Sequence, residues 1–295
     1  MSISRGLLAA VAAAAVSSAS ALAAEPAKPT LRYIPPVTNP TFAESPMITT
    51  ELRPIYIHHD IPGSFATAGG EVNVIALQAR LALTDRLALI ATKDGLASAD
   101  YGALPDDDGI LNIAAGLKYA VIDEPEAGHI LTVGARYEMP VGNLDAGPFQ
   151  IQGKGKGFAN LFASGVKQWG NFQVQASGNA HIAIDPDVDS SMLVGSLQVN
   201  YAVLEDFLLG GFYPLVELNV FHYLNDPGRT PLTAAGFDVL HLGQSDSDTV
   251  VSGAVGFRMH ITDGFQMGGA VEMPLTDDNG EITNWRVTAD AIIRF

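Results

Sequence analysis

The chain ends Asn284-Trp285-Arg286-Val287-Thr288-Ala289-Asp290-Ala291-Ile292-Ile293-Arg294-Phe295, and this segment alternates between two kinds of side chain. Every second residue, counted back from Phe295, is apolar. Apart from Ile292, the positions between them are polar or charged: Arg286, Thr288, Asp290 and Arg294. A period of two over this length predicts a β-strand with one apolar and one polar face.

The composition favours a membrane protein that crosses the bilayer with strands. Hydrophobic residues make up 47% of the 295-residue chain and charged residues only 16%, which is below the usual quarter. No run of 18 apolar residues follows the first 24, so transmembrane helices are not indicated. Apolar residues at alternate positions are typical of a transmembrane barrel. Cysteine is absent, which excludes disulfides and Cys-ligated metals.

The N-terminus has the pattern of a secretory signal peptide. Arg5 provides the positive start, residues 6–16 form an apolar run, and Ala21-Leu22-Ala23 offers a small-x-small cleavage site. We predict a signal peptide over residues 1–24 and export from the cytoplasm. The alternative is a short helix of the mature fold.

Proline then dominates residues 25–48, with prolines at 26, 29, 35, 36, 40 and 46. This density prevents a helix or an interior strand. We predict an extended periplasmic arm that leads into the barrel. The alternative, an arm that enters the lumen, is left open by the sequence.

Twelve candidate strands follow, and they form one predicted domain over residues 49–295. They run approximately over 49–59, 71–83, 87–93, 110–121, 129–138, 158–168, 172–184, 191–203, 207–222, 249–261, 264–273 and 282–295. Most have the length that a tilted strand needs to cross a bilayer. Ten or fourteen strands are alternative counts.

The connections between these strands alternate strictly between short turns and mostly longer loops. The short set is 84–86, 123–128, 169–171, 204–206 and 262–264, and the other set is 60–70, 94–109, 139–157, 185–190, 223–248 and 274–281. Outer-membrane barrels have short periplasmic turns and longer outside loops. We therefore predict an all-β, antiparallel, up-and-down barrel of about 12 strands in the bacterial outer membrane. A soluble sandwich or soluble barrel is the alternative.

Two stretches near the predicted barrel start carry a resemblance to known proteins. Residues 46–59 with 70–74 read PMITTELRPIYIHH and GEVNV, and residues 80–95 read RLALTDRLALIATKDG. They resemble a group of bacterial outer-membrane barrels similar to the channel-like proteins of phenol-degradation (meta-pathway) type. The resemblance implies a barrel and uptake of small organic, hydrophobic or aromatic molecules, and it supplies no catalytic residues.

Alternation also assigns charged residues to the inner face of the barrel. An Arg or Lys that faced lipid at the bilayer midplane would cost roughly 2–4 kcal/mol, so charges within strands indicate the inward face. We predict ten pore-lining residues: Arg80, Lys118, Arg136, Glu138, Glu217, Arg258, Glu272, Arg286, Asp290 and Arg294. The alternative role for them is a set of salt bridges that brace a narrow lumen. Phe295 is the predicted assembly signal, recognised by the barrel-assembly machinery.

The outside loops hold 17 of the 32 acidic residues and few basic ones. Local clusters are Asp106–Asp108, Asp185 with Asp187 and Asp189, Asp246 with Asp248, and Asp277 with Asp278. Such loops form an electronegative mouth, or bridge to lipopolysaccharide through divalent ions. A calcium site is the less favoured reading, because the late Glu and the Gly of an EF-hand are missing. The net charge of −16 argues against nucleic-acid binding.

These observations favour passive passage of small solutes as the function, with membrane lipid and lipopolysaccharide as neighbours. The alternatives are a structural or surface-interaction barrel with a closed lumen and a lipid-modifying enzyme. His181, Asn179 and Ser177 share one strand face, but no matching catalytic motif is visible, so we expect no enzyme. The seven histidines are scattered, and we expect neither a metal site nor a cofactor.

Overall fold

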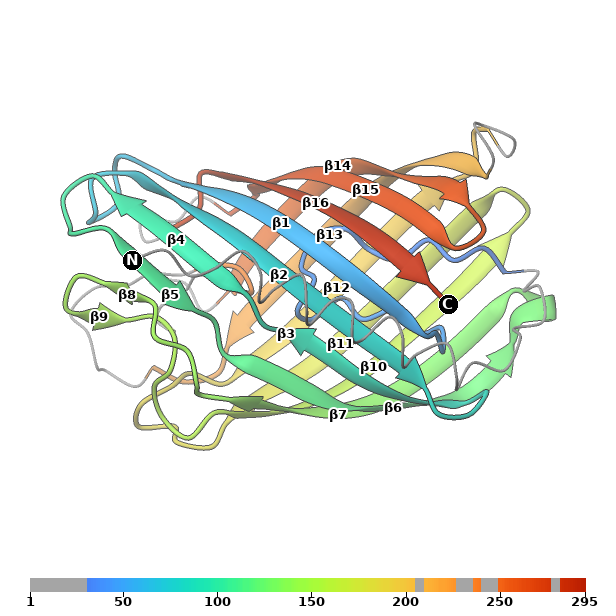
Figure 1. Ribbon diagram of the computed structural model, residues 1–295, viewed down its shortest axis with the longest axis horizontal. Helices are drawn as coiled ribbons and strands as arrows, with labels where there is room; N and C mark the ends of the chain where they lie inside the picture. Colours follow the sequence, from blue (N-terminus) through green and yellow to red (C-terminus); the bar gives the residue numbers. More distant parts are fainter. Residues whose placement is uncertain (1–30, 205–209, 227–235, 240–248, 277–281) are drawn as a thin grey trace.

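The chain forms a closed antiparallel β-barrel, as predicted (Figure 1). The structure, a computed structural model, describes residues 31–204, 210–226, 236–239, 249–276 and 282–295. The first strand pairs with the last strand on one side and with the second on the other, which closes a barrel of 12 strand positions. The predicted signal peptide lies outside the described residues.

The strands match the predicted order, with shifted ends. The barrel strands are β1 (Glu51–Ile61), β2 (Gly70–Ala82), β3 (Leu87–Lys93), β4 (Leu96–Tyr101), β5 (Asp107–Ile110), β6 (Ile113–Glu124), β7 (His129–Met139), β10 (Phe158–Trp169), β11 (Phe172–Ala183), β12 (Met192–Tyr201), β13 (Gly211–Tyr223), β14 (Thr249–Thr262), β15 (Phe265–Pro274) and β16 (Trp285–Arg294). A 3-10 helix, η1 (Pro125–Ala127), lies in a predicted turn, and a hairpin of β8 (Asp145–Ala146) and β9 (Phe149–Gln150) lies in a predicted loop. No helix in the described part of the chain is long and apolar enough to cross a membrane.

Two strand positions are interrupted, which the sequence did not indicate. β2 pairs with β3 near one end and with β4 near the other, so β3 and β4 occupy one strand position. β5 and β6 share the next position in the same way. The prediction of a loop over 94–109 was therefore wrong, because both interruptions lie within the wall. At the first, Leu77 donates its backbone N–H to the Asp94 carboxylate at 2.9 Å.

The two faces of the wall have the predicted chemistry. On β11, Phe172, Ala176 and Ile182 are exposed, whereas Gln173, Gln175, Asn179 and His181 are buried. Thirty-six large apolar side chains in the described residues are exposed on the molecule. A wall that is apolar outside and polar inside suits hydrocarbon and not water, which supports the predicted location in the outer membrane.

Residues 31–47 lie inside the barrel, which corrects the periplasmic arm predicted over 25–48. Val37, Asn39 and Glu44 have 0% exposure although they belong to no strand. Residues 25–30 lie outside the described residues. The physical reason is that a proline-rich segment forms no ladder of its own, whereas the inner wall offers partners for its backbone. We call residues 31–47 the lumenal arm.

The lumenal arm explains the single exception in the terminal strand. Ile292 faces inward and is fully buried, in a cluster with Leu31, Tyr33 and Met47 of the arm. An apolar side chain is stable at an inward position only where another apolar group covers it. The alternation therefore breaks at Ile292 because the arm covers this position on the inner wall.

Deletion of Phe295 should impair barrel assembly. Phe295 donates its backbone N–H to the carbonyl of Thr50 at 3.1 Å and lies beside the seam between β1 and β16, where we expect the insertion machinery to recognise the closing strand. The expected result is a smaller fraction of heat-modifiable, folded protein in membranes. Phe172→Ala, which truncates another partly exposed aromatic residue at a strand end, is the control and should assemble normally. Normal assembly of the deletion would contradict the prediction.

Candidate functional site: the filled lumen

The lumenal arm enters at the end of the barrel that carries the short turns, which we call the turn end. Arg32 accepts the side-chain amide of Gln173 on its carbonyl at 2.8 Å, and its guanidinium donates to the carbonyl of Gly170 in the β10–β11 turn. From there the arm runs into the lumen to a tight bend at residues 39–43, where the backbone N–H of Ala43 donates to the carbonyl of Asn39 at 2.8 Å. It then returns to the turn end and leads into β1.

Glu217 on β13 binds the ascending part of the arm. Its two carboxylate oxygens accept the backbone N–H groups of Val37 at 2.8 Å and Thr38 at 2.7 Å. The Thr38 hydroxyl donates to the same carboxylate. These bonds satisfy backbone donors that the arm could not pair within itself. Glu217 is thus a binding group for an extended peptide.

Two guanidinium groups bind the carbonyls of the same part of the arm. Arg258 donates to Pro35 at 2.9 Å, and Arg53 donates to Pro36 at 2.7 Å. Asp290 accepts from both of these arginines, at 2.8 Å from Arg258 Nη1 and 2.7 Å from Arg53 Nε. One buried carboxylate therefore pairs with both of the cations that hold the proline carbonyls.

Glu44 anchors the returning part of the arm. Its carboxylate lies 2.6 Å from Arg80 Nη2 and 2.8 Å from Lys118 Nζ. Lys118 also donates to the carbonyls of Ser45 at 2.9 Å and Met47 at 2.7 Å. Burial opposes ionisation of Glu44, but the attraction of Arg80 and Lys118 prevails and holds the pKa of this carboxyl well below its ordinary value of 4.5.

Acid should loosen this anchor. A carboxyl whose pKa is lowered by its native contacts stabilises the native state fully above its ordinary pKa, and that stabilisation is lost as the pH falls below it. We therefore expect protection of the arm against protease added at the turn end to decrease between pH 5 and pH 2 or so. In Glu44→Gln the part of this pH dependence due to Glu44 should be missing, and an unchanged profile would contradict the prediction.

An extracellular loop enters the lumen from the opposite end, which we call the loop end. Residues 236–239 are all buried. Asp238 forms an ion pair with Arg286 of β16 and accepts the backbone N–H of Thr41, near the bend of the arm, at 3.3 Å. Glu272 accepts from the same guanidinium at 2.6 Å. The loop and the arm thus meet inside the barrel, at one arginine.

The structure places nine of the ten predicted pore-lining residues inward, each at most 6% exposed. It joins Arg258 with Asp290, Arg286 with Glu272, and Arg80 with Lys118 around Glu44. Arg136 donates to Asn160 and Asn179, and Glu138 pairs with Lys93 at 2.6 Å. The tenth, Arg294, lies at the turn end with its guanidinium 5.1 Å from the centre of the Tyr33 ring.

Sequence reasoning missed several members of this network: Glu44, Glu51, Arg53, Lys93 and Asp238. Arg53 has the same parity as Ile55 and Ile57 in a predicted strand, so alternation could have placed it inside. Lys93 faces inward because the register between β3 and β6 shifts between Ala91 and Lys93. No sequence signal indicates that shift. Glu44 and Asp238 lie outside the strands, where alternation gives no information.

A small cavity lies among these groups. A cavity of about 10 Å³ lies beside Pro36 and is lined by polar side chains that include Gln175, Ser177 and Glu217, which is room for about one water molecule. Residues 31–47 of the arm and residues 236–239 of the loop, which are buried with few exceptions, occupy space inside the barrel.

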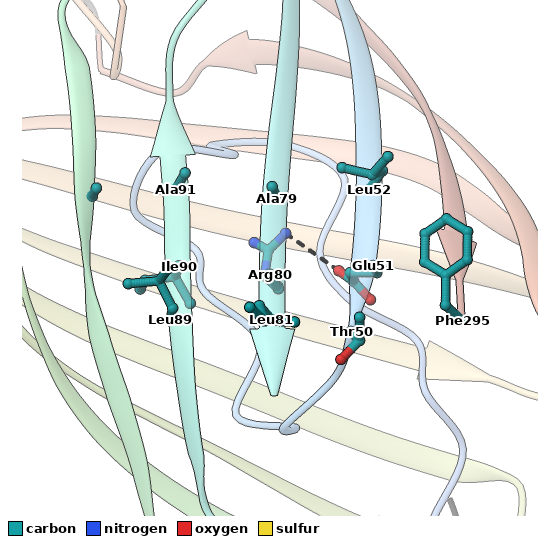
Figure 2. A pocket seen from close by; sticks show the side chains of 11 residues that line it. Thr50, Glu51, Leu52, Ala79, Arg80, Leu81, Leu89, Ile90, Ala91 and Phe295 are labelled. Atoms are coloured by element: carbon teal, nitrogen blue, oxygen red, sulfur yellow. Dashed lines mark hydrogen bonds and ion pairs between the residues drawn. The ribbon is translucent and has the colours of Figure 1, made fainter. Parts of the chain in front are cut away.

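A larger hollow of about 180 Å³ lies at the turn end and opens on the outer wall (Figure 2). Its outer rim contains Leu52, Leu81, Leu89 and Phe295. Ala79, Ala91 and Ala115, which occupy adjacent ladder positions, form a shallow stretch of the wall. The ion pair of Arg80 with Glu51 borders the hollow from the inner face, at 3.2 Å (Figure 2). Because the rim is apolar and faces the bilayer, this hollow belongs to the lipid-facing surface.

The other candidate sites do not form in the described residues. Within the described ranges no group of three or more His, Asp or Glu side chains could hold a metal ion; the pairs at 246/248 and 277/278 lie outside these ranges. Asp185 pairs with Lys156 at 3.1 Å. His181 lies between the rings of Phe42 and Phe158, and Ser177, four residues away on the same strand, is about 13 Å distant along it, beyond hydrogen-bond reach.

Comparisons with known proteins support the fold. No protein-family model and no curated protein matches the sequence. An outer membrane channel from Pseudomonas putida F1 is similar in structure, with a TM-score of 0.60 and 19% identity over 89% of this chain and 100% of that chain. The NanC porin has a TM-score of 0.48 and 8% identity, over 83% of this chain and 98% of that chain. LpxR from Salmonella typhimurium has a TM-score of 0.47 and 10% identity, over 83% and 100% of the two chains. At 19% identity the likeness to the Pseudomonas putida channel shows the fold alone, an outer-membrane-type barrel.

Proposed function

We propose that this protein is a passive outer-membrane channel for small solutes, and not an enzyme, in which the lumenal arm regulates the width of the path. The supporting observation is the way in which the arm is held. Hydrogen bonds and ion pairs from Glu217, Arg258 and Lys118 hold its backbone and its one buried carboxylate. Water and solutes can replace such polar contacts, whereas a uniformly apolar core would expel them.

The class of solute follows from the chemistry of the loop end, and here we propose small hydrophobic or aromatic molecules. Ile55, Ile57, Val72 and Val74 face inward from β1 and β2 and pack against residues of the loops, including Leu144. An apolar inner sector under the outside loops would favour entry of solutes with a large apolar part over small inorganic ions. The resemblance of the sequence to channel-like barrels implies the same class.

The second candidate function is a structural or surface-interaction barrel with a closed lumen. It is favoured by the complete burial of arm residues such as Val37, Asn39 and Glu44, which places the arm within the lumen. Under this alternative the arm would be a permanent part of the core.

Planar-bilayer recording of the full-length mature protein separates the two functions. Discrete channel openings from a folded, heat-modifiable sample would support the channel, because ions must then cross a lumen from which the arm has withdrawn. Electrical silence of the same sample, together with no uptake of small aromatic molecules into proteoliposomes, would support the closed barrel.

A further inference from the structure

The loop residues Phe237 and Asp238 occupy a position in the lumen that has the features of a ligand site. The Phe237 ring stacks on Phe221 with a centroid distance of 5.8 Å and meets the ring of His59 edge-on at 6.2 Å. The guanidinium of Arg286 lies 4.9 Å from the centre of the same ring. Arg286 also forms the ion pair with Asp238. One buried cation thus contacts an aromatic ring and a carboxylate together.

The surrounding wall is built around this arrangement. Arg286 and Glu272 are 0% exposed, and Glu272 accepts from Arg286 at 2.9 and 2.6 Å. Glu272 in turn accepts from Asn219 at 2.9 Å. These bonds fix the guanidinium while its Nη1 atom points to Asp238. A guanidinium fixed in this way is suited to charge-assisted recognition of a carboxylate.

The charges favour replacement of Asp238 by another carboxylate over withdrawal of Asp238 alone. If Asp238 withdrew alone, Arg286 would keep only Glu272, and the backbone N–H of Thr41 would lose its acceptor. Leaving a buried cation partly unpaired is costly. An incoming carboxylate restores both contacts, and it stands as close to Glu272 as Asp238 does now, so it adds no new repulsion.

We propose that Phe237 and Asp238 occupy the binding site of the solute, and that this site binds small aromatic carboxylates whose ring and carboxylate are joined by a flexible linker. The ring would take the place of the Phe237 ring between Phe221 and Arg286, and the carboxylate would take the place of Asp238. The flexible linker is needed because the ring lies over the guanidinium, whereas the carboxylate lies beside its nitrogen atoms. The inference rests on the proposed channel function, because binding at this site would select the solute only if the barrel conducts solutes.

Equilibrium binding of 3-phenylpropionate to the full-length mature barrel in detergent tests the proposal by calorimetry. Asp238→Ala should bind it about tenfold or more tightly than the natural protein, because the site is no longer occupied by the competing carboxylate. Asp187→Ala removes an exposed carboxylate from another loop at the same end and is the matched control, with unchanged affinity expected. 3-Phenylpropanol, which lacks the charge, and propionate, which lacks the ring, should bind at least tenfold more weakly to Asp238→Ala.

The same experiment can overturn the proposal. It fails if Asp238→Ala binds 3-phenylpropionate no better than the natural protein does, or if it binds 3-phenylpropanol equally well. It also fails if Asp187→Ala raises the affinity as much. Should Asp238→Ala fold poorly, Phe237→Ala carries the same expectation through loss of the competing ring. Because binding is measured without transport, a barrel that is electrically silent, takes up no small aromatic molecule and still binds 3-phenylpropionate would refute the channel and leave the site intact.

Discussion

Glu44→Ala should release the returning part of the lumenal arm and open the barrel. In the native protein Glu44 is the shared partner of Arg80 and Lys118, and all three side chains are fully buried or nearly so. Removal of one partner of a buried ion pair typically costs about 3–5 kcal/mol, because the remaining charge is left uncompensated. Arg80 keeps its ion pair with Glu51, so the uncompensated charge is that of Lys118. Hydration of Lys118 relieves that cost if the arm withdraws, so the open state is favoured.

Single-channel recording should show the effect as larger and longer openings than in the natural protein, and protease should cut the arm faster from the turn end. Glu71→Ala is the matched control, because Glu71 is an exposed carboxylate on the outer face of β2. Its conductance should equal that of the natural protein. If Glu44→Ala stays as closed and as protected as the natural protein, the arm is a permanent core element and the gating role is wrong.

The barrel was predictable because its determinants are local. Alternation within one strand reports which residues face lipid, and turn lengths report which end of the barrel each connection occupies. The terminal strand shows both the strength and the limit of this reasoning. Alternation predicts that Asp290 and Arg286 face inward, and both are buried there. It gives no reason for the apolar Ile292 at an inward position, which the arm covers.

The site was harder to predict because its partners are distant in sequence and lie outside periodic segments. Glu217 contacts residues 179 and 180 positions away, and Arg286 contacts a loop residue 48 positions away. A proline-rich composition predicts an extended backbone, but it gives no information about what that backbone binds. The two interruptions in the wall likewise depend on pairing between strands: β3 and β4 both pair with β2, whereas β6 pairs with β3 and β5 pairs with β4.

Val255→Arg should prevent stable insertion of the barrel, and this prediction tests the assignment of the two faces directly. Val255 lies near the middle of β14 and is 65% exposed, so its side chain meets hydrocarbon if the outer wall faces the bilayer. An Arg at the bilayer midplane costs about 2–4 kcal/mol in a transmembrane barrel. The expected result is a large fall in the folded fraction, measured by heat-modifiable mobility after refolding into lipid vesicles.

Val255→Leu provides the control, because it changes size without charge and should fold as the natural protein does. A second comparison separates lipid exposure from general intolerance of a new charge. Asp187→Arg introduces the same side chain at an exposed loop position, where water solvates it, and should fold normally. If Val255→Arg inserts as well as Asp187→Arg, the exposed apolar face of β14 does not contact lipid, and the membrane orientation argued from the alternation of the strands would be wrong.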